Sequence, residues 1–277
     1  MNNLCPTYLC PICAGPLSLH DKSLACEQRH QFDLAKEGYV NLLPVQNKKS
    51  KNPGDNKEMM QARREFLDQG FYQSLSDKVN SIAQQALTAV SAPNVLDLGC
   101  GEGYYTHRLA QVISNTEPQI AGLDISKSAI RYAAKRYKSI NFCVASAYAT
   151  PFADASQDLV TRIYAPSQDA ELARIIKIDG YLITVTPAAE HLFELKQKIY
   201  QTPEKHDMTI EEIAGFTLVE QQRLTDVITL TQAKDSKNLL EMTPLAWKMN
   251  DEQKAVLYAA DLTLTLDFHI TLYKRTA

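Results

Sequence analysis

The sequence predicts an α/β fold in which a doubly wound, mainly parallel sheet follows a small cysteine-rich module. Between residues 95 and 186, short apolar runs alternate with helical segments, which is the pattern of strands joined by crossover helices. Four of the six cysteines lie before residue 27. A chain of 277 residues with 45% hydrophobic residues accommodates one large core and a small module.

The expected elements follow one another in a regular order. Apolar residues recur at helical spacing over 57–68 and 75–87, so two helices should precede the sheet. Strands are then expected at 95–98, 120–123, 140–144, 159–163 and 181–186, with helices at 104–112 and 170–176 among the connections. In the tail, runs with strand character at 216–222, 226–231 and 263–273 surround a helix at 236–242. This tail predicts an antiparallel finish to the sheet.

The turn after the strand at 95–98 carries glycines at alternate positions, Gly99, Gly101 and Gly103. Glycines there let the backbone turn sharply and approach a ligand that a Cβ would exclude. The N–H groups that begin the next helix face the same place. A Walker loop would end in Gly-Lys-Ser/Thr, and a dinucleotide loop would space its glycines differently. Asp97 and Glu102 would repel a pyrophosphate, but they suit a ligand that carries ammonium and sulfonium groups.

A further acid indicates that the ligand is a nucleoside. The apolar run at 120–123 ends at Asp124, which stands 21 residues after Gly103. An acid at the end of the second strand, about 20 residues past the glycines, accepts hydrogen bonds from two ribose hydroxyls. The alternative is an ordinary glycine turn with an unrelated surface aspartate. The stretch at 95–103 resembles the first motif of class I S-adenosylmethionine-dependent methyltransferases, and the position of Asp124 agrees with it.

The N-terminal cysteines have the spacing of a zinc site. Cys10 and Cys13 form a Cys-x-x-Cys pair, and Cys26 and His30 lie four apart after 12 intervening residues. Four soft ligands with no open position indicate a structural role for the ion. Cys5 could compete with Cys10, but only Cys10 has the Cys-x-x-Cys partner. A redox pair or a disulfide is the alternative, although disulfides suit secreted proteins.

Charge is distributed unevenly along the chain. Residues 1–64 carry nine Lys and Arg against six Asp and Glu, whereas the remainder carries 20 against 26. A basic front suggests an anionic partner, although compositional scatter explains it equally well. The basic loop at 47–57 is either a solvated linker or an arm that touches phosphates. No apolar run reaches membrane length and no signal-peptide pattern is present, so a cytoplasmic protein without a membrane partner is expected.

Over nearly its whole length, the chain resembles the large-subunit (23S) ribosomal RNA guanine-N1-methyltransferases. The most specific matches are the Cys-Pro-Ile-Cys pair at 10–13, the stretch 26–44, the Met-Met-Gln-Ala-Arg-Arg run at 59–64, the loop 97–107 and the segment 162–166. Family members often read Lys-Pro-Gly-Gly where this chain has Lys-Ile-Asp-Gly at 177–180. The resemblance implies a class I methyltransferase, Rossmann-like doubly wound sheet that follows the zinc-binding module.

The resemblance also implies particular roles. Cys10, Cys13, Cys26 and His30 match the zinc ligands of the family. Tyr72 matches a tyrosine that contacts S-adenosylmethionine, Gly101 and Glu102 match the loop that holds its methionine end, and His191 matches a histidine near it. The implied substrate is a guanine in a 23S rRNA hairpin, and a homodimer is implied by the family alone. Without the family resemblance, the sequence favours a packed aromatic ring for Tyr72 and a surface position for His191.

These observations divide the chain into a zinc-binding RNA-recognition module at 1–46, a basic linker and helix at 47–71, and a methyltransferase domain at 72–277. The target base must leave its stack, so Tyr104, Tyr105 or Tyr164 could stack on it, unless they are core packing. The sequence selects no catalytic base. The alternative functions are methylation of another RNA or of a small metabolite, with a purely structural zinc site, and a non-catalytic RNA-binding role.

Overall fold

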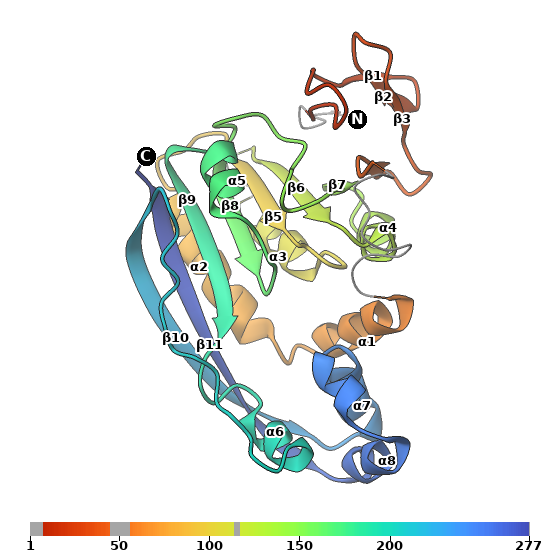
Figure 1. The fold of residues 1–277 in the computed structure, drawn as a ribbon, viewed down its shortest axis with the longest axis vertical. Helices are drawn as coiled ribbons and strands as arrows, with labels where there is room; N and C mark the ends of the chain where they lie inside the picture. The colour runs from red at the N-terminus through yellow and green to blue at the C-terminus, as the bar shows by residue number, and fades with distance from the viewer. Residues whose placement is uncertain (1–7, 45–55, 114–116, 277) are drawn as a thin grey trace.

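The computed structural model describes residues 8–44, 56–113 and 117–276. Among these residues the main sheet has eight strands in the order β10-β11-β9-β8-β5-β6-β7-β4 (Figure 1). Neighbouring strands run parallel from β4 to β9, and β11 then pairs antiparallel with both β9 and β10. The strands are β4 Val40–Asn41, β5 Asn94–Leu98, β6 Gln119–Asp124, β7 Asn141–Val144, β8 Gln157–Ile163, β9 Ile176–Pro187, β10 Phe216–Leu230 and β11 Leu262–Arg275. The predicted doubly wound sheet with an antiparallel finish is therefore confirmed.

The helices cover both faces of this sheet. They are α1 Lys57–Asp68, α2 Gln73–Ala86, α3 Tyr104–Val112, α4 Lys127–Arg136, α5 Asp169–Ile175, α6 Phe193–Ile199, α7 Ala233–Glu241 and α8 Asp251–Ala259, with a 3-10 helix at Pro244–Lys248. Side chains of a strand alternate between its faces. Val95 accordingly packs in one core with residues of α2, α3 and α4, whereas Leu96 packs in a second core with residues of α5 and of the N-terminal module.

The N-terminal module joins the main sheet, which the sequence did not indicate. Its own small sheet consists of β1 Ser18–His20, β2 Ser23–Ala25 and β3 Gln31–Asp33. The two-residue strand β4 then pairs parallel with β7 at the edge of the large sheet. The Tyr8 ring also packs on the Phe152 ring, with a centroid separation of 5.4 Å. The module is therefore docked against the large domain by backbone pairing and by apolar contacts.

The tail differs from the expectation in two respects: it contains a 3-10 helix and α8 besides the predicted helix, and its first two strands are continuous. The runs predicted at 216–222 and 226–231 are a single strand, β10. The polar residues between the two runs remain paired with β11 because they bind a buried carboxylate on that strand. Arg223 donates two hydrogen bonds of 2.7 Å to the carboxylate of Asp267, and the Thr225 hydroxyl donates a third at 3.1 Å. Burial alone would raise the pKa of Asp267, but these bonds lower it to about 2.

The segment between β10 and β11 folds into a cap. The outer halves of β10 and β11 extend past the end of β9, and the cap of α7, the 3-10 helix and α8 connects them (Figure 1). Helix α1 packs along α7, where Glu65 forms an ion pair with Lys234 and accepts a hydrogen bond from Asn238. This arrangement encloses a space between the cap and the sheet. No helix among the described residues is both long and apolar enough to span a membrane.

Candidate functional site

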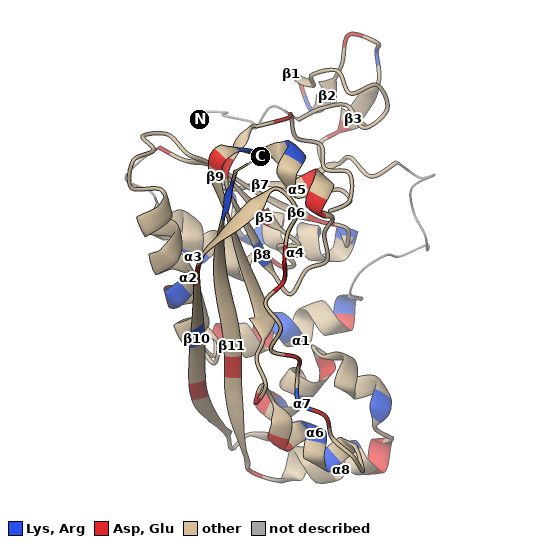
Figure 2. Ribbon diagram, turned by 60° about the vertical axis from the view of Figure 1, so that its left-hand side comes forward, with Lys and Arg blue, Asp and Glu red and all other residues tan. Residues whose placement is uncertain are grey.

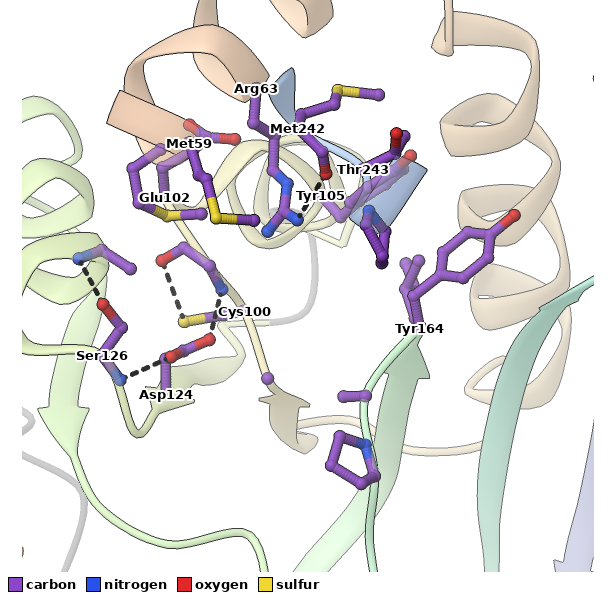
Figure 3. A pocket seen from close by; sticks show the side chains of 18 of the residues that line it. Met59, Arg63, Cys100, Glu102, Tyr105, Asp124, Ser126, Tyr164, Met242 and Thr243 are labelled. Atoms are coloured by element: carbon purple, nitrogen blue, oxygen red, sulfur yellow. Dashed lines mark hydrogen bonds between the residues drawn. The ribbon is translucent and has the colours of Figure 1, made fainter. Parts of the chain in front are cut away.

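A cavity of about 720 Å³ lies between the sheet and the cap, at the carboxyl ends of β5, β6 and β8. Its volume is in the range of pockets that hold small organic ligands. In open α/β sheets, ligands bind outside these strand ends. Figure 3 shows Asp124 and Ser126 at one side of the cavity and Tyr164 at the other, with Met59, Arg63 and Glu102 on the side of α1.

The glycine loop forms the floor of this cavity. Gly99, at a φ of 78°, and Gly101, at a φ of 56°, both adopt the left-handed conformation. The N–H groups of Gly99 and Cys100 donate to the carbonyl of Leu123 at 2.8 and 3.0 Å, which bends the loop toward β6. A Cβ built on Gly99 would lie 2.3 Å from the Cβ of Ala165, closer than real carbon atoms approach. Gly99 is therefore required both by its backbone angle and by the closeness of the loop after β8.

Three carboxylates face or underlie the cavity. Asp97 is buried and accepts hydrogen bonds from Thr106, at 2.5 Å, and Thr161, at 2.9 Å, while burial raises its pKa to about 6. Burial also raises the pKa of Glu102 to about 7, and the nearby cation of Arg63 partly opposes this shift. Asp124 accepts the Gly101 N–H at 3.0 Å, as Figure 3 shows. The acid at the end of β6 thus lies directly against the glycine loop.

All of the predicted cofactor residues except Gly103 line the cavity, namely Tyr72, Asp97, Gly99, Gly101, Glu102, Asp124 and His191. Gly103 caps the start of α3 instead, with a φ of 86°. A Cβ there would press against Ala133 and Tyr137 at 3.1 Å and Phe142 at 3.2 Å. The third glycine therefore serves close packing of the helix on β7 and α4.

His191 is held in one tautomer. Its Nδ1 accepts the backbone N–H of Asp267 at 3.2 Å, so a neutral ring carries its proton on Nε2. Burial lowers the pKa of His191 to about 3, with a smaller contribution in the same direction from the neighbouring His206. The His191 ring contacts the rings of Tyr72 and Phe268. The histidine is thus a neutral hydrogen-bond donor at the wall of the cavity.

Helix α1 contributes wall residues that the sequence did not assign. Met59, Met60 and Arg63 line the cavity, and Arg63 donates to the carbonyl of Met242 at 3.5 Å. Met60 is only 1% exposed, so it is a buried residue as well as part of the cavity wall. Helical spacing alone cannot separate a core position from a cavity wall. The only signal was the match of residues 59–64 to the family.

The four predicted zinc ligands converge in the N-terminal module. Their ligand atoms, from Cys10, Cys13, Cys26 and His30, all lie within 4.8 Å of one another. The His30 Nδ1 is 3.5 Å from the Cys10 sulfur and 3.4 Å from the Cys26 sulfur, and the Cys13 and Cys26 sulfurs are 3.6 Å apart. Ligands of a tetrahedral zinc ion with Zn–S bonds of about 2.3 Å lie about 3.8 Å apart. The donor set and its spacing therefore fit Zn²⁺. Cys5, the alternative ligand, lies outside the described residues, as does nearly all of the basic loop at 47–57.

Comparison with known proteins agrees with both parts of the chain. Residues 8–51 match the family model described as "RlmA, N-terminal", and residues 89–244 match a methyltransferase domain. The Bacillus subtilis protein YxjB, named as a 23S rRNA (guanine-N1)-methyltransferase, is 34% identical over 95% of this chain and 96% of its own. The chain belongs to the 23S rRNA (guanine-N1)-methyltransferase family. The Streptomyces fradiae 23S rRNA (guanine(748)-N(1))-methyltransferase is 31% identical over 94% of this chain and 95% of its own.

Membership of this family fixes the reaction class and the cofactors. The protein is an S-adenosylmethionine-dependent methyltransferase with a structural zinc site. The departure from the family pattern at 177–180 lies in β9, and none of these residues lines the cavity. The cavity and the zinc-binding module are therefore the two places where function should be sought.

Proposed function

We propose that the protein transfers a methyl group from S-adenosylmethionine to N1 of a guanine in a hairpin loop of 23S rRNA. The observation that carries this proposal is the docking of a zinc-binding module on the catalytic sheet through β4. Relatives that share both parts are named for this activity. A third such relative, from Micromonospora griseorubida, is 30% identical over 98% of both chains.

The cofactor is proposed to lie along the cavity from Asp124 to Tyr72. Asp124, at the end of β6, accepts the ribose hydroxyls. The loop at Gly99 and Gly101 lets the backbone approach, and Glu102 binds the ammonium group. The guanidinium of Arg63 faces this acidic region from α1 and pairs with the carboxylate of the methionine moiety. Tyr72 and His191 complete the wall beside it.

When bound, S-adenosylmethionine supplies a methyl group already activated by its positive sulfur. Guanine N1 carries a proton, so that proton must leave as the new carbon–nitrogen bond forms. The Nδ1 of His191 already accepts a hydrogen bond from the Asp267 N–H, so this nitrogen does not take up the proton of guanine N1. Its Nε2–H is suited to donate a hydrogen bond to an oxygen on which negative charge develops, such as guanine O6.

The N-terminal module is proposed to hold the RNA over the cavity, together with the basic loop at 47–57. Figure 2 shows acidic and basic residues interspersed along α1, α6, α7 and α8. The ribosomal substrate implies that the protein works in the cytoplasm. A homodimer is part of the proposal, and light scattering at assay concentrations tests it.

The test is methylation of a 23S rRNA transcript with labelled S-adenosylmethionine, followed by primer extension. N1-methylguanine blocks base pairing, so extension should stop one nucleotide before the modified guanine only after treatment. Asp124→Ala, which should still fold, is the control without cofactor binding. Labelled methyl on a small metabolite and none on RNA would support the alternative function. Failure to bind S-adenosylmethionine in calorimetry would support a non-catalytic role.

A further inference from the structure

Tyr164 occupies a distinctive place beside the cofactor loop. It directly follows β8, which is the neighbour of β5 in the sheet. The next residue, Ala165, is the one that leaves no room for a Cβ on Gly99. The Tyr164 N–H donates to the carbonyl of Val185 at 3.2 Å, which ties this turn to β9. The backbone of Tyr164 is therefore fixed between two strands, at the edge of the cofactor loop.

The conformation of Tyr164 is strained, and its ring is accessible. Its φ is 55°, in the left-handed region that a bulky side chain rarely adopts. Such strain persists where surrounding contacts impose it, and it gathers at functional sites. The residue is 47% exposed and lines the cavity, whereas Tyr72 and His191, its neighbours there, are 6% and 7% exposed. The fold thus presents an exposed aromatic side chain beside two buried rings of the cavity wall.

Other aromatic residues fit this role less well. Tyr104 is buried outside the cavity, beneath the guanidinium of Arg108 at 5.6 Å. Tyr105 lines the cavity, but its ring packs edge-on against Tyr104 at 5.1 Å. Tyr148 is exposed and lines the cavity beyond β7, on the Asp124 side, where the nucleoside of the cofactor is proposed to lie. Tyr164 is at the opposite side, as Figure 3 shows.

We propose that Tyr164 is the positioning residue on which the target guanine stacks once it has left the RNA hairpin. An enzyme that modifies a base takes it out of the stack and holds it against aromatic side chains. The ring of Tyr164 has His191 at 6.1 Å and Phe268 at 6.3 Å between centroids, so it is supported by a wall of rings. This inference rests on the proposed function, because it needs a nucleobase as the methyl acceptor.

The experiment compares Tyr164→Phe, Tyr164→Ala and the control Tyr200→Ala, an exposed tyrosine that does not line the cavity. For each protein, calorimetry gives the Kd for S-adenosylhomocysteine, and methylation of the 23S rRNA transcript gives KM for RNA and kcat. Melting curves show whether each variant is folded. Phenylalanine keeps the stacking face and alanine removes it, so the pair isolates the ring.

Tyr164→Ala should lower kcat/KM for RNA about 10- to 100-fold, since stacking of one base on an aromatic ring has an effect of this size. Its Kd for S-adenosylhomocysteine should stay within about twofold of wild type, and Tyr164→Phe and Tyr200→Ala should retain wild-type activity. The proposal would be overturned if Tyr164→Ala had wild-type kinetics, or if its affinity for S-adenosylhomocysteine fell by the same factor as its kcat/KM for RNA. If the wild-type protein itself fails to methylate RNA, the proposed function fails before the role of Tyr164 is reached.

Discussion

Replacement of Gly99 by alanine is the sharpest perturbation of the cofactor loop. The new Cβ would lie 2.3 Å from the Ala165 Cβ, whereas carbon atoms pack at about 3.5–4.0 Å. The loop after β8 or the glycine loop must therefore move by more than an ångström. Overpacking of this kind costs about 1–3 kcal/mol, and the left-handed φ of 78° adds about 1–2 kcal/mol. Together these terms predict a loss of about 2–5 kcal/mol in the free energy of unfolding.

Gly38→Ala supplies the matched control for the backbone term. Gly38 has a φ of 100°, but a Cβ there would meet nothing within 4 Å. Urea unfolding should therefore show a loss of about 1–2 kcal/mol for Gly38→Ala. The difference between the two variants measures the clash. Calorimetry with S-adenosylmethionine should detect weaker binding only for Gly99→Ala.

Ala165→Gly should restore much of what Gly99→Ala loses, because it removes the methyl group that the new Cβ meets. A double-mutant cycle on unfolding free energies isolates this coupling. Equal destabilisation by Gly99→Ala and Gly38→Ala, or a cycle without coupling between positions 99 and 165, would refute the assignment of the glycine to close packing.

Three further predictions follow from the carboxylates and the zinc module. Asp124→Asn should weaken binding of S-adenosylmethionine about 10- to 100-fold in calorimetry, because charged hydrogen bonds to the ribose are lost; unchanged affinity would remove Asp124 from the cofactor site. Folding raises the pKa of Glu102 from 4.5 to about 7. Between these pH values the folded state binds more protons than the unfolded state, so the free energy of unfolding falls as the pH rises from about 4.5 to about 7. Glu102→Gln should therefore be more stable than wild type at pH 8, by about 1–3 kcal/mol, and this difference should vanish below about pH 4.5. Denaturant unfolding across this pH range measures the difference, and equal stability of the two proteins throughout would contradict the assignment. Cys26→Ser, or chelation of the metal, should lower the melting temperature and RNA methylation together, since zinc organises the module that supplies β4; an unchanged melting curve would argue against a structural ion.

The sequence was most informative where local pattern and tertiary role coincide. The strands from β5 to β8 were predictable because each contains a short apolar run followed by a turn or a helix. Strand β9 was predicted only in part, because it begins at Ile176, before the apolar run at 181–186. The glycine loop and Asp124 were predictable as a pair because a nucleoside ligand demands both, and the structure brings them within a hydrogen bond of 3.0 Å.

Other features depend on partners far away in the chain. The two residues of β4 carry no recognisable periodicity, and only the edge of β7 makes them a strand. The polar run at Arg223 and Thr225 looked like a break in β10 because the buried Asp267 that it serves is over 40 residues later. Gly103 was assigned to the cofactor by its spacing, but its neighbours are side chains of α4 and β7.

The role of Tyr164 is of the same kind. From sequence it was one of three tyrosines that could stack on a base. A positive φ, an exposed ring and the contact between Ala165 and Gly99 separate it from the others, and none of these can be read from a motif.

We propose that the protein methylates a guanine of ribosomal RNA at N1 in this cavity. The most direct measurement is mass spectrometry of nuclease fragments from a 23S rRNA transcript treated with the protein and S-adenosylmethionine. We expect a single N1-methylguanine within a hairpin loop, absent when Asp124→Ala replaces the wild-type protein. A methyl group at another atom, on another base, or on no RNA at all would contradict it.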